Sequence, residues 1–149
     1  MTTSLLSTAT GDFRIDLQGP ADAPVLMLSN SLGTTLEMWD AQAAALRSEF
    51  RVLRYDTRGH GASVCSSGPY SVDQLGRDVL AILDALQVQQ AHFCGISMGG
   101  LTGLWLGVNA GQRLCSLTVA NSAAKIGVES AWLERAAQVR ANGAAGMLA

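Results

Sequence analysis

The sequence lacks the features that mark membrane, secreted and nucleic-acid-binding proteins. Only 15% of its 149 residues are charged and the formal net charge is -2, so we expect no basic surface for nucleic acid. No apolar run approaches the roughly 20 residues of a membrane span. Residues 1–10 lack the basic start and apolar centre of a secretory signal. These absences predict a cytoplasmic protein with neither a nucleic-acid nor a membrane partner.

Cysteine and histidine are also scarce. The three cysteines, Cys65, Cys94 and Cys115, lie far apart and never at Cys-x-x-Cys spacing, which predicts neither a disulfide framework nor a zinc site. The chain has only two histidines, His60 and His92. We therefore expect no metal and no cofactor.

Hydrophobic residues make up 48% of the chain, which predicts one globular domain with a substantial core. Strand-like and helix-like segments alternate, which is typical of an α/β domain with a largely parallel sheet. Ser71 and Gln74 predict a capping box at one helix start. The predicted strands are 13–17, 25–29, 50–55 and 114–120, with a further strand and its turn together at 91–99. The predicted helices are 36–47, from 71 to about 86, from the end of that turn to 109, and 129–141.

Three loops follow predicted strands and are expected at one edge of the sheet. They are Asn30–Thr35, Asp56–Gly61 and the turn around Ser97. Because catalytic groups in open parallel sheets lie at the carboxyl ends of strands, this edge is the predicted site.

The turn Gly95-Ile96-Ser97-Met98-Gly99 lies between a predicted strand and a predicted helix. This context is that of a nucleophile elbow, in which a strained turn exposes the serine hydroxyl. The turn requires flanking residues without a Cβ, which Gly95 and Gly99 supply. The Met98 N–H falls in the first helical turn, where it has no intrahelical partner. A nucleophile and an oxyanion donor are thus predicted from one turn. The alternative is a glycine-rich connection without chemistry.

With these loops identified, the chain resembles an α/β-hydrolase, and in particular the 3-oxoadipate enol-lactonases of aromatic catabolism (the β-ketoadipate pathway). The resemblance extends over about residues 18–126, and its motifs lie at 28–33, 38–40, 50–63, 74–79, 92–101 and 121–126. It implies an α/β-hydrolase fold, a small lactone or ester substrate, and hydrolysis of an enol-lactone without a cofactor.

The resemblance also implies roles for individual residues. Ser97 is the expected nucleophile, and the backbone N–H groups of Met98 and Leu32 are the expected oxyanion hole. Arg58 has two interpretations: it fixes its loop through a local ion pair with Asp56, or it contacts an anionic substrate.

The acid and histidine of a serine triad are missing. In this fold they follow the serine, but His60 and His92 both precede Ser97. We expect His60 to pack and hydrogen-bond locally. The resemblance therefore implies the amino-terminal part of one hydrolase domain, with a core to about residue 126 and the start of a lid at 127–149. Strand 114–120 would then be a sheet edge through which the chain self-associates.

Three functions stay open on the sequence. The first is an enol-lactonase that acts through Ser97. The second is a non-catalytic fragment that keeps the elbow but has no base. The third is a promiscuous esterase or cofactor-free perhydrolase, which would share every residue named above.

Overall fold

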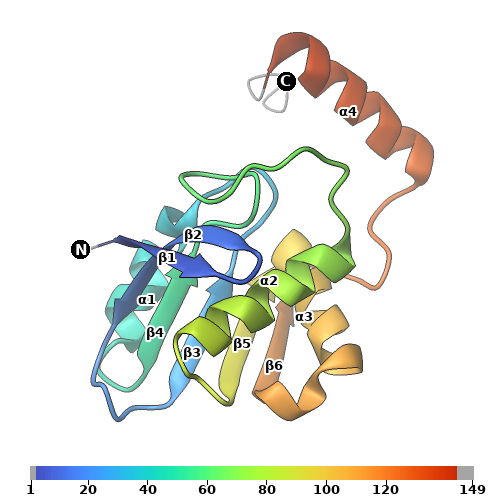
Figure 1. Ribbon diagram of the computed structural model, residues 1–149. Helices are drawn as coiled ribbons and strands as arrows, with labels where there is room; N and C mark the ends of the chain where they lie inside the picture. The colour runs from blue at the N-terminus through green and yellow to red at the C-terminus, as the bar shows by residue number, and fades with distance from the viewer. Residues whose placement is uncertain (1–2, 144–149) are drawn as a thin grey trace.

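The computed structural model describes residues 3–143, over which one six-stranded sheet carries helices on both faces (Figure 1). The strands are β1 (Ser4–Thr8), β2 (Gly11–Gln18), β3 (Val25–Ser29), β4 (Arg51–Tyr55), β5 (Ala91–Ile96) and β6 (Leu114–Ala120). The helices are η1 (Leu36–Trp39), α1 (Asp40–Leu46), α2 (Val72–Ala85), α3 (Met98–Asn109), η2 (Gly111–Arg113) and α4 (Glu129–Asn142), where η denotes a 3-10 helix.

The sheet order is β1-β2-β4-β3-β5-β6. Strands β4, β3, β5 and β6 are parallel to their neighbours, whereas β1–β2 and β2–β4 are antiparallel pairs. The predicted largely parallel sheet is thus present, with an antiparallel extension at one side. The sequence predicts no strand before Phe13, because apolar and polar residues do not alternate in Ser4–Thr8. In the structure this segment is a strand, and most of its residues are exposed. Pairing with β2 determines that strand instead.

Alternate residues along the central strands supply two cores, one on each face of the sheet. Met27, Leu53 and Phe93 pack on the face covered by α2 and α3, and they are at most 1% exposed. Leu28 and Val52, which neighbour them in sequence, lie in the other cluster. That second cluster includes Trp39 and Ala43 from η1 and α1, together with Leu26, Met38, Leu46, Phe50, Cys94 and Ile96.

One helix start and one half of a predicted helix cap differ from the prediction. Residues 36–47 do not form one helix, because the segment begins as a 3-10 turn with Met38 N–H bonded to the Thr35 carbonyl at 3.1 Å. At α2 the Ser71 hydroxyl accepts the Gln74 N–H at 3.1 Å, as predicted. The reciprocal half of the capping box is wrong, because the Gln74 side chain donates to Asp78 at 3.1 Å.

Strand β6 lies at a sheet edge and pairs only with β5 among the described residues. Helix α4 stands beyond the carboxyl ends of the parallel strands, away from the sheet (Figure 1). It falls in the range 127–149 expected to begin a lid, of which residues 144–149 lie outside the described residues.

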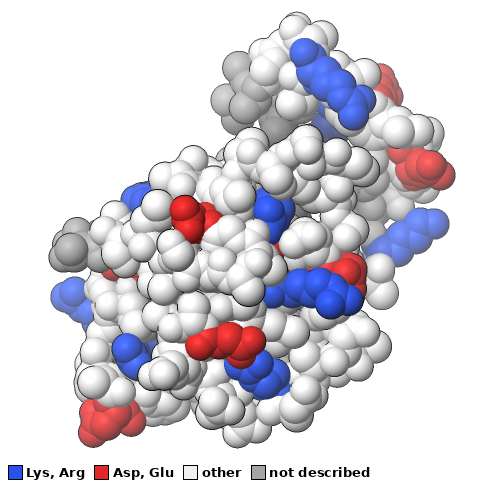
Figure 2. Space-filling view, in the orientation of Figure 1, with Lys and Arg blue, Asp and Glu red and all other residues white. Residues whose placement is uncertain are grey.

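The surface shows no concentration of basic charge on the face seen in Figure 2, where lysines and arginines are interspersed with acidic residues. In the part of the chain that the structure describes, no helix has the length and apolarity needed to cross a membrane.

Candidate active site

Ser97 lies between β5 and α3 with φ 53° and ψ -113°. A non-glycine residue at positive φ is strained, at a cost of roughly 1–3 kcal/mol, and such strain is concentrated at functional sites. Two contacts from the end of β6 hold it there. The Ser97 N–H donates to the Ala120 carbonyl at 3.0 Å, and the Ser122 hydroxyl donates to the Ser97 carbonyl at 2.7 Å.

The predicted elbow glycines are required by close approach of backbone atoms. A Cβ on Gly95 would lie 2.1 Å from the Gly99 carbonyl oxygen, and one on Gly99 would lie 2.2 Å from the Ser29 carbonyl oxygen. Neither glycine has a positive φ. The conformational strain therefore falls on Ser97 itself, and the glycines let α3 begin directly against β3 and β5.

The loop that follows β3 is fixed to the elbow by Asn30, which is fully buried. Its carbonyl accepts the Gly99 N–H at 3.0 Å. Its side chain accepts the Trp39 indole N–H at 3.0 Å and donates to the Tyr55 carbonyl at 2.8 Å. Asn30 thus joins the loop, the elbow and β4, a role that the sequence did not indicate.

The two predicted oxyanion donors line one cavity with Ser97. Within residues 3–143 neither the Leu32 N–H nor the Met98 N–H has a hydrogen-bond acceptor. Met98 opens α3, so its N–H is one of the donors that a helix start leaves free. The cavity has a volume of about 530 Å³. Its mostly apolar lining consists of Leu32, Arg58, His60, Tyr70, Ser71, Val72, Leu75, Ser97, Met98, Leu101, Ile126 and Trp132.

The expected ion pair between Asp56 and Arg58 is wrong. Arg58 instead pairs with Asp78 of α2, at 2.7 Å from Nε and 2.6 Å from Nη2. This contact raises the pKa of the guanidinium. Asp56 instead accepts the Leu36 N–H at 2.8 Å and pairs with Arg14 at 3.2 Å. The fold gives both side chains partners far along the chain.

Arg58 is 5% exposed and also donates to the Thr10 carbonyl at 2.7 Å. Its donors are thus used mainly to join α2 to the hairpin of β1 and β2. Contact between Arg58 and an anionic substrate stays a prediction.

His60 makes the expected hydrogen bond within its own loop and a second one, which was not expected, to the loop that follows β3. Its Nε2 accepts the Gly33 N–H at 2.9 Å, and its Nδ1 lies 3.1 Å from the Arg58 carbonyl. Both ring nitrogens are therefore occupied. His92 lies in β5 and contacts the Ser116 hydroxyl at 2.8 Å. Among the described residues, neither histidine is hydrogen-bonded to Ser97.

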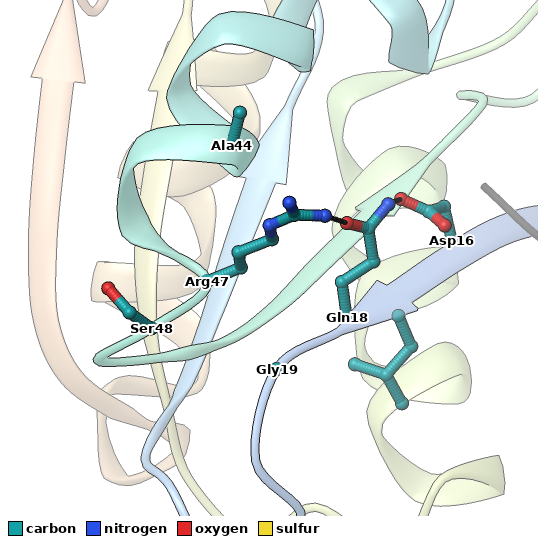
Figure 3. A pocket seen from close by; sticks show the side chains of 7 residues that line it. Asp16, Gln18, Gly19, Ala44, Arg47 and Ser48 are labelled. Atoms are coloured by element: carbon teal, nitrogen blue, oxygen red, sulfur yellow. Dashed lines mark hydrogen bonds between the residues drawn. The ribbon is translucent and has the colours of Figure 1, made fainter.

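A second cavity lies near the amino-terminal ends of the parallel strands, opposite the ends that carry Ser97. It is found where Gln18 pairs with Val52 at the start of β4. Figure 3 shows its hydrogen-bonded chain, in which Arg47 donates to Gln18 and Gln18 donates to Asp16. Among the residues that line this cavity, none other than glycine has a positive φ. Within residues 3–143, no group of three His, Cys, Asp or Glu side chains is placed to hold a metal ion. The edge that carries Ser97 is therefore the candidate active site.

A sequence model of the α/β-hydrolase fold matches residues 24–143. The chain belongs to the α/β-hydrolase family. The chain is 55% identical over 135 residues to 3-oxoadipate enol-lactonase 1 of Acinetobacter baylyi, covering 91% of this chain and 50% of that protein. Its identity to enol-lactonase 2 of the same organism is 57% over 125 residues, or 84% of this chain and 47% of that protein.

The fold agrees with these matches. The crystal structure of the enol-lactonase from Burkholderia xenovorans superposes with a TM-score of 0.91 at 44% identity, covering 94% of this chain and 55% of that one. The predicted α/β-hydrolase fold is confirmed. The chain spans about half the length of the curated relatives that it matches.

Proposed function

We propose that this α/β-hydrolase chain carries the nucleophile and oxyanion hole of an enzyme that hydrolyses an enol-lactone. The observation that supports this most is the strained Ser97, which faces a cavity that is also lined by Leu32 and Met98, two residues with unpaired N–H groups. The named relatives are 3-oxoadipate enol-lactonases, and 3-oxoadipate enol-lactone, which would yield 3-oxoadipate, is the proposed substrate.

The reaction proposed is acyl transfer through Ser97. Its Oγ attacks the lactone carbonyl while a base takes the hydroxyl proton. The tetrahedral oxyanion accepts hydrogen bonds from the Leu32 and Met98 N–H groups, each donor contributing on the order of 10²–10³ in rate. The ring C–O bond then breaks and the enol oxygen takes up the proton, which moves to the neighbouring carbon as the enol tautomerises to a ketone. Water then hydrolyses the acyl-serine, which releases the carboxylic acid and restores the Ser97 hydroxyl.

Neither histidine of this chain is positioned to be that base. Both ring nitrogens of His60 are occupied, and His92 lies within β5. A serine hydroxyl without a positioned base is a weak nucleophile near neutral pH. We therefore expect the 149-residue chain alone to have little activity, limited to what the oxyanion hole provides. Rapid turnover of an aryl ester by this chain, abolished by His60→Ala, would contradict that expectation.

The proposed nucleophile is tested by Ser97→Ala in the longest polypeptide that the gene encodes. We expect kcat to fall by about 10⁴-fold or more, as on loss of a triad member. Ser48→Ala, an exposed serine at the second cavity, is the matched control and should leave turnover unchanged. If a serine-directed phosphonate probe labels Ser97→Ala as strongly as Ser48→Ala, Ser97 is not the nucleophile. Comparing an enol-lactone with a simple aryl ester and with perhydrolysis distinguishes a lactonase from an esterase or a perhydrolase.

A further inference from the structure

The peptide that carries the Leu32 N–H is held from its carbonyl side. The Ser31 carbonyl accepts two hydrogen bonds from Thr34, one from its N–H at 3.3 Å and one from its hydroxyl at 2.8 Å. Because a peptide group is planar and trans, fixing that carbonyl also fixes the direction of the Leu32 N–H on its opposite side. The first of the two peptides that flank Leu32 is thus anchored within its own loop.

The second peptide is anchored by another loop. Its N–H, that of Gly33, donates to His60 Nε2 at 2.9 Å. The imidazole is in turn held by the contact of Nδ1 with the Arg58 carbonyl at 3.1 Å and by the His60 N–H bonded to the Thr57 carbonyl at 2.9 Å. Arg58 is itself immobilised by its buried pair with Asp78. The hydrogen bond that holds Gly33 is therefore connected through His60 and Arg58 to α2.

These contacts require one form of the imidazole. A neutral histidine has one N–H and one acceptor nitrogen. Since the Arg58 carbonyl can only accept, Nδ1 carries the proton and Nε2 is the acceptor. A histidine that holds the loop in this way cannot use Nε2 to take the Ser97 proton without releasing Gly33.

We propose that His60 is a positioning residue for the oxyanion hole, acting through Gly33 on the Leu32 N–H. The proposal rests on the function proposed above. His60 and Thr34 fix the two peptides on either side of Leu32, so its N–H is aimed into the cavity before substrate arrives. Such preorganisation gives oxyanion donors their effect on rate, whereas substrate binding depends on it much less.

The test uses two variants that each keep half of the imidazole's contacts. In His60→Gln the side-chain oxygen reaches the place of Nε2 and can accept the Gly33 N–H. In His60→Asn the shorter amide reaches only the place of Nδ1 and keeps the contact with the Arg58 carbonyl. In the longest polypeptide that the gene encodes, we expect His60→Asn to lower kcat by about 10–100-fold with KM within about twofold, and His60→Gln to retain most of the unsubstituted kcat. His92→Gln, at the other histidine of residues 1–149, is the control and should match the unsubstituted enzyme.

A second readout does not depend on turnover. Nitrogen NMR of the 149-residue chain should show His60 protonated at Nδ1, with a scalar coupling from the Gly33 N–H to Nε2. The coupling should be absent in His60→Asn. A proton on Nε2, or equal kcat for the Asn and Gln variants, would overturn the proposal. If His60→Asn does not fold, Thr34→Val removes the hydroxyl bond to Ser31 instead and should show the same selective loss of kcat. Turnover that survives Ser97→Ala would instead overturn the proposed function, leaving NMR to decide whether His60 holds the loop.

Discussion

The Arg58 guanidinium and the Asp78 carboxylate form a two-pronged ion pair, with distances of 2.7 and 2.6 Å, and both side chains are almost fully buried. The pair connects the loop after β4 to α2. Because His60 follows Arg58 by two residues and bonds to its carbonyl, the same pair also supports the loop that carries the Leu32 N–H. A buried ion pair is thus connected through His60 to the loop of the proposed oxyanion hole.

Asp78→Asn should destabilise the protein strongly, because it leaves the buried Arg58 charge without its partner. The expected loss is about 3–5 kcal/mol in the free energy of unfolding, measured by urea denaturation. Asp73→Asn is the matched control on the same helix, since Asp73 pairs with Arg77 at 2.8 Å but both are more than half exposed. That change should cost less than about 1 kcal/mol. Equal losses in the two variants would show that burial of the Arg58 pair does not matter.

Asn30→Ala should cost about 2–4 kcal/mol, because it leaves the Trp39 indole N–H and the Tyr55 carbonyl buried without their partners. Asn109→Ala is the control, because its side chain donates to the Trp105 carbonyl at the exposed end of α3. We expect the control to change the unfolding free energy by less than about 1 kcal/mol. A tryptophan fluorescence change in Asn30→Ala alone would confirm that Trp39 lost its contact.

The parts of the fold that were predicted are those with strong local patterns. Val25–Ser29 and Leu114–Ala120 have the predicted bounds, because continuous apolar or β-branched runs mark such strands. Ser4–Thr8 was not predicted, since it becomes a strand only by pairing with β2. The 3-10 start at Leu36 was also missed, because its N–H is held by Asp56 from twenty residues away.

The same distinction applies to the site. The elbow at Ser97 follows from five consecutive residues, so the sequence indicates it directly. The partners of Arg58 and Gly33 lie 20 and 27 residues away, respectively, and no spacing rule connects them. The wrong Asp56–Arg58 pair shows the error that results when a charge is assigned to its nearest neighbour in sequence. Contacts of this kind require the packed structure.

Stability should depend on pH through Glu37, whose pKa is lowered to about 2 by its hydrogen bond to Arg14. Since the folded pKa lies below the ordinary value of 4.5, the contribution is complete above about pH 5 and is lost as pH falls toward 2. Glu37 is about half exposed, so the contribution should not exceed about 1 kcal/mol. Urea denaturation of Glu37→Gln should show a deficit at about pH 7 that shrinks toward pH 3. Glu49→Gln, which breaks no ion pair among the described residues, should show none.

Strand β6 should promote self-association of the 149-residue chain. It pairs only with β5 in the described structure, and most of its residues, among them Thr118 and Val119, are exposed. An edge strand with free N–H and C=O groups can pair with a second copy. We expect size-exclusion chromatography to show concentration-dependent oligomers, accompanied by binding of a hydrophobic dye.

A lysine on that edge should oppose such pairing, because a second copy would have to bury or displace its charge. Thr118→Lys is therefore expected to shift the chain toward monomer at equal concentration. Gln42→Lys, on the exposed face of α1, adds the same charge away from β6 and should leave the oligomers unchanged. An equal shift in both variants would mean that net charge, and not the β6 edge, controls association. The prediction of self-association is wrong if the unsubstituted chain is a monomer that binds no dye and unfolds in one sharp cooperative transition.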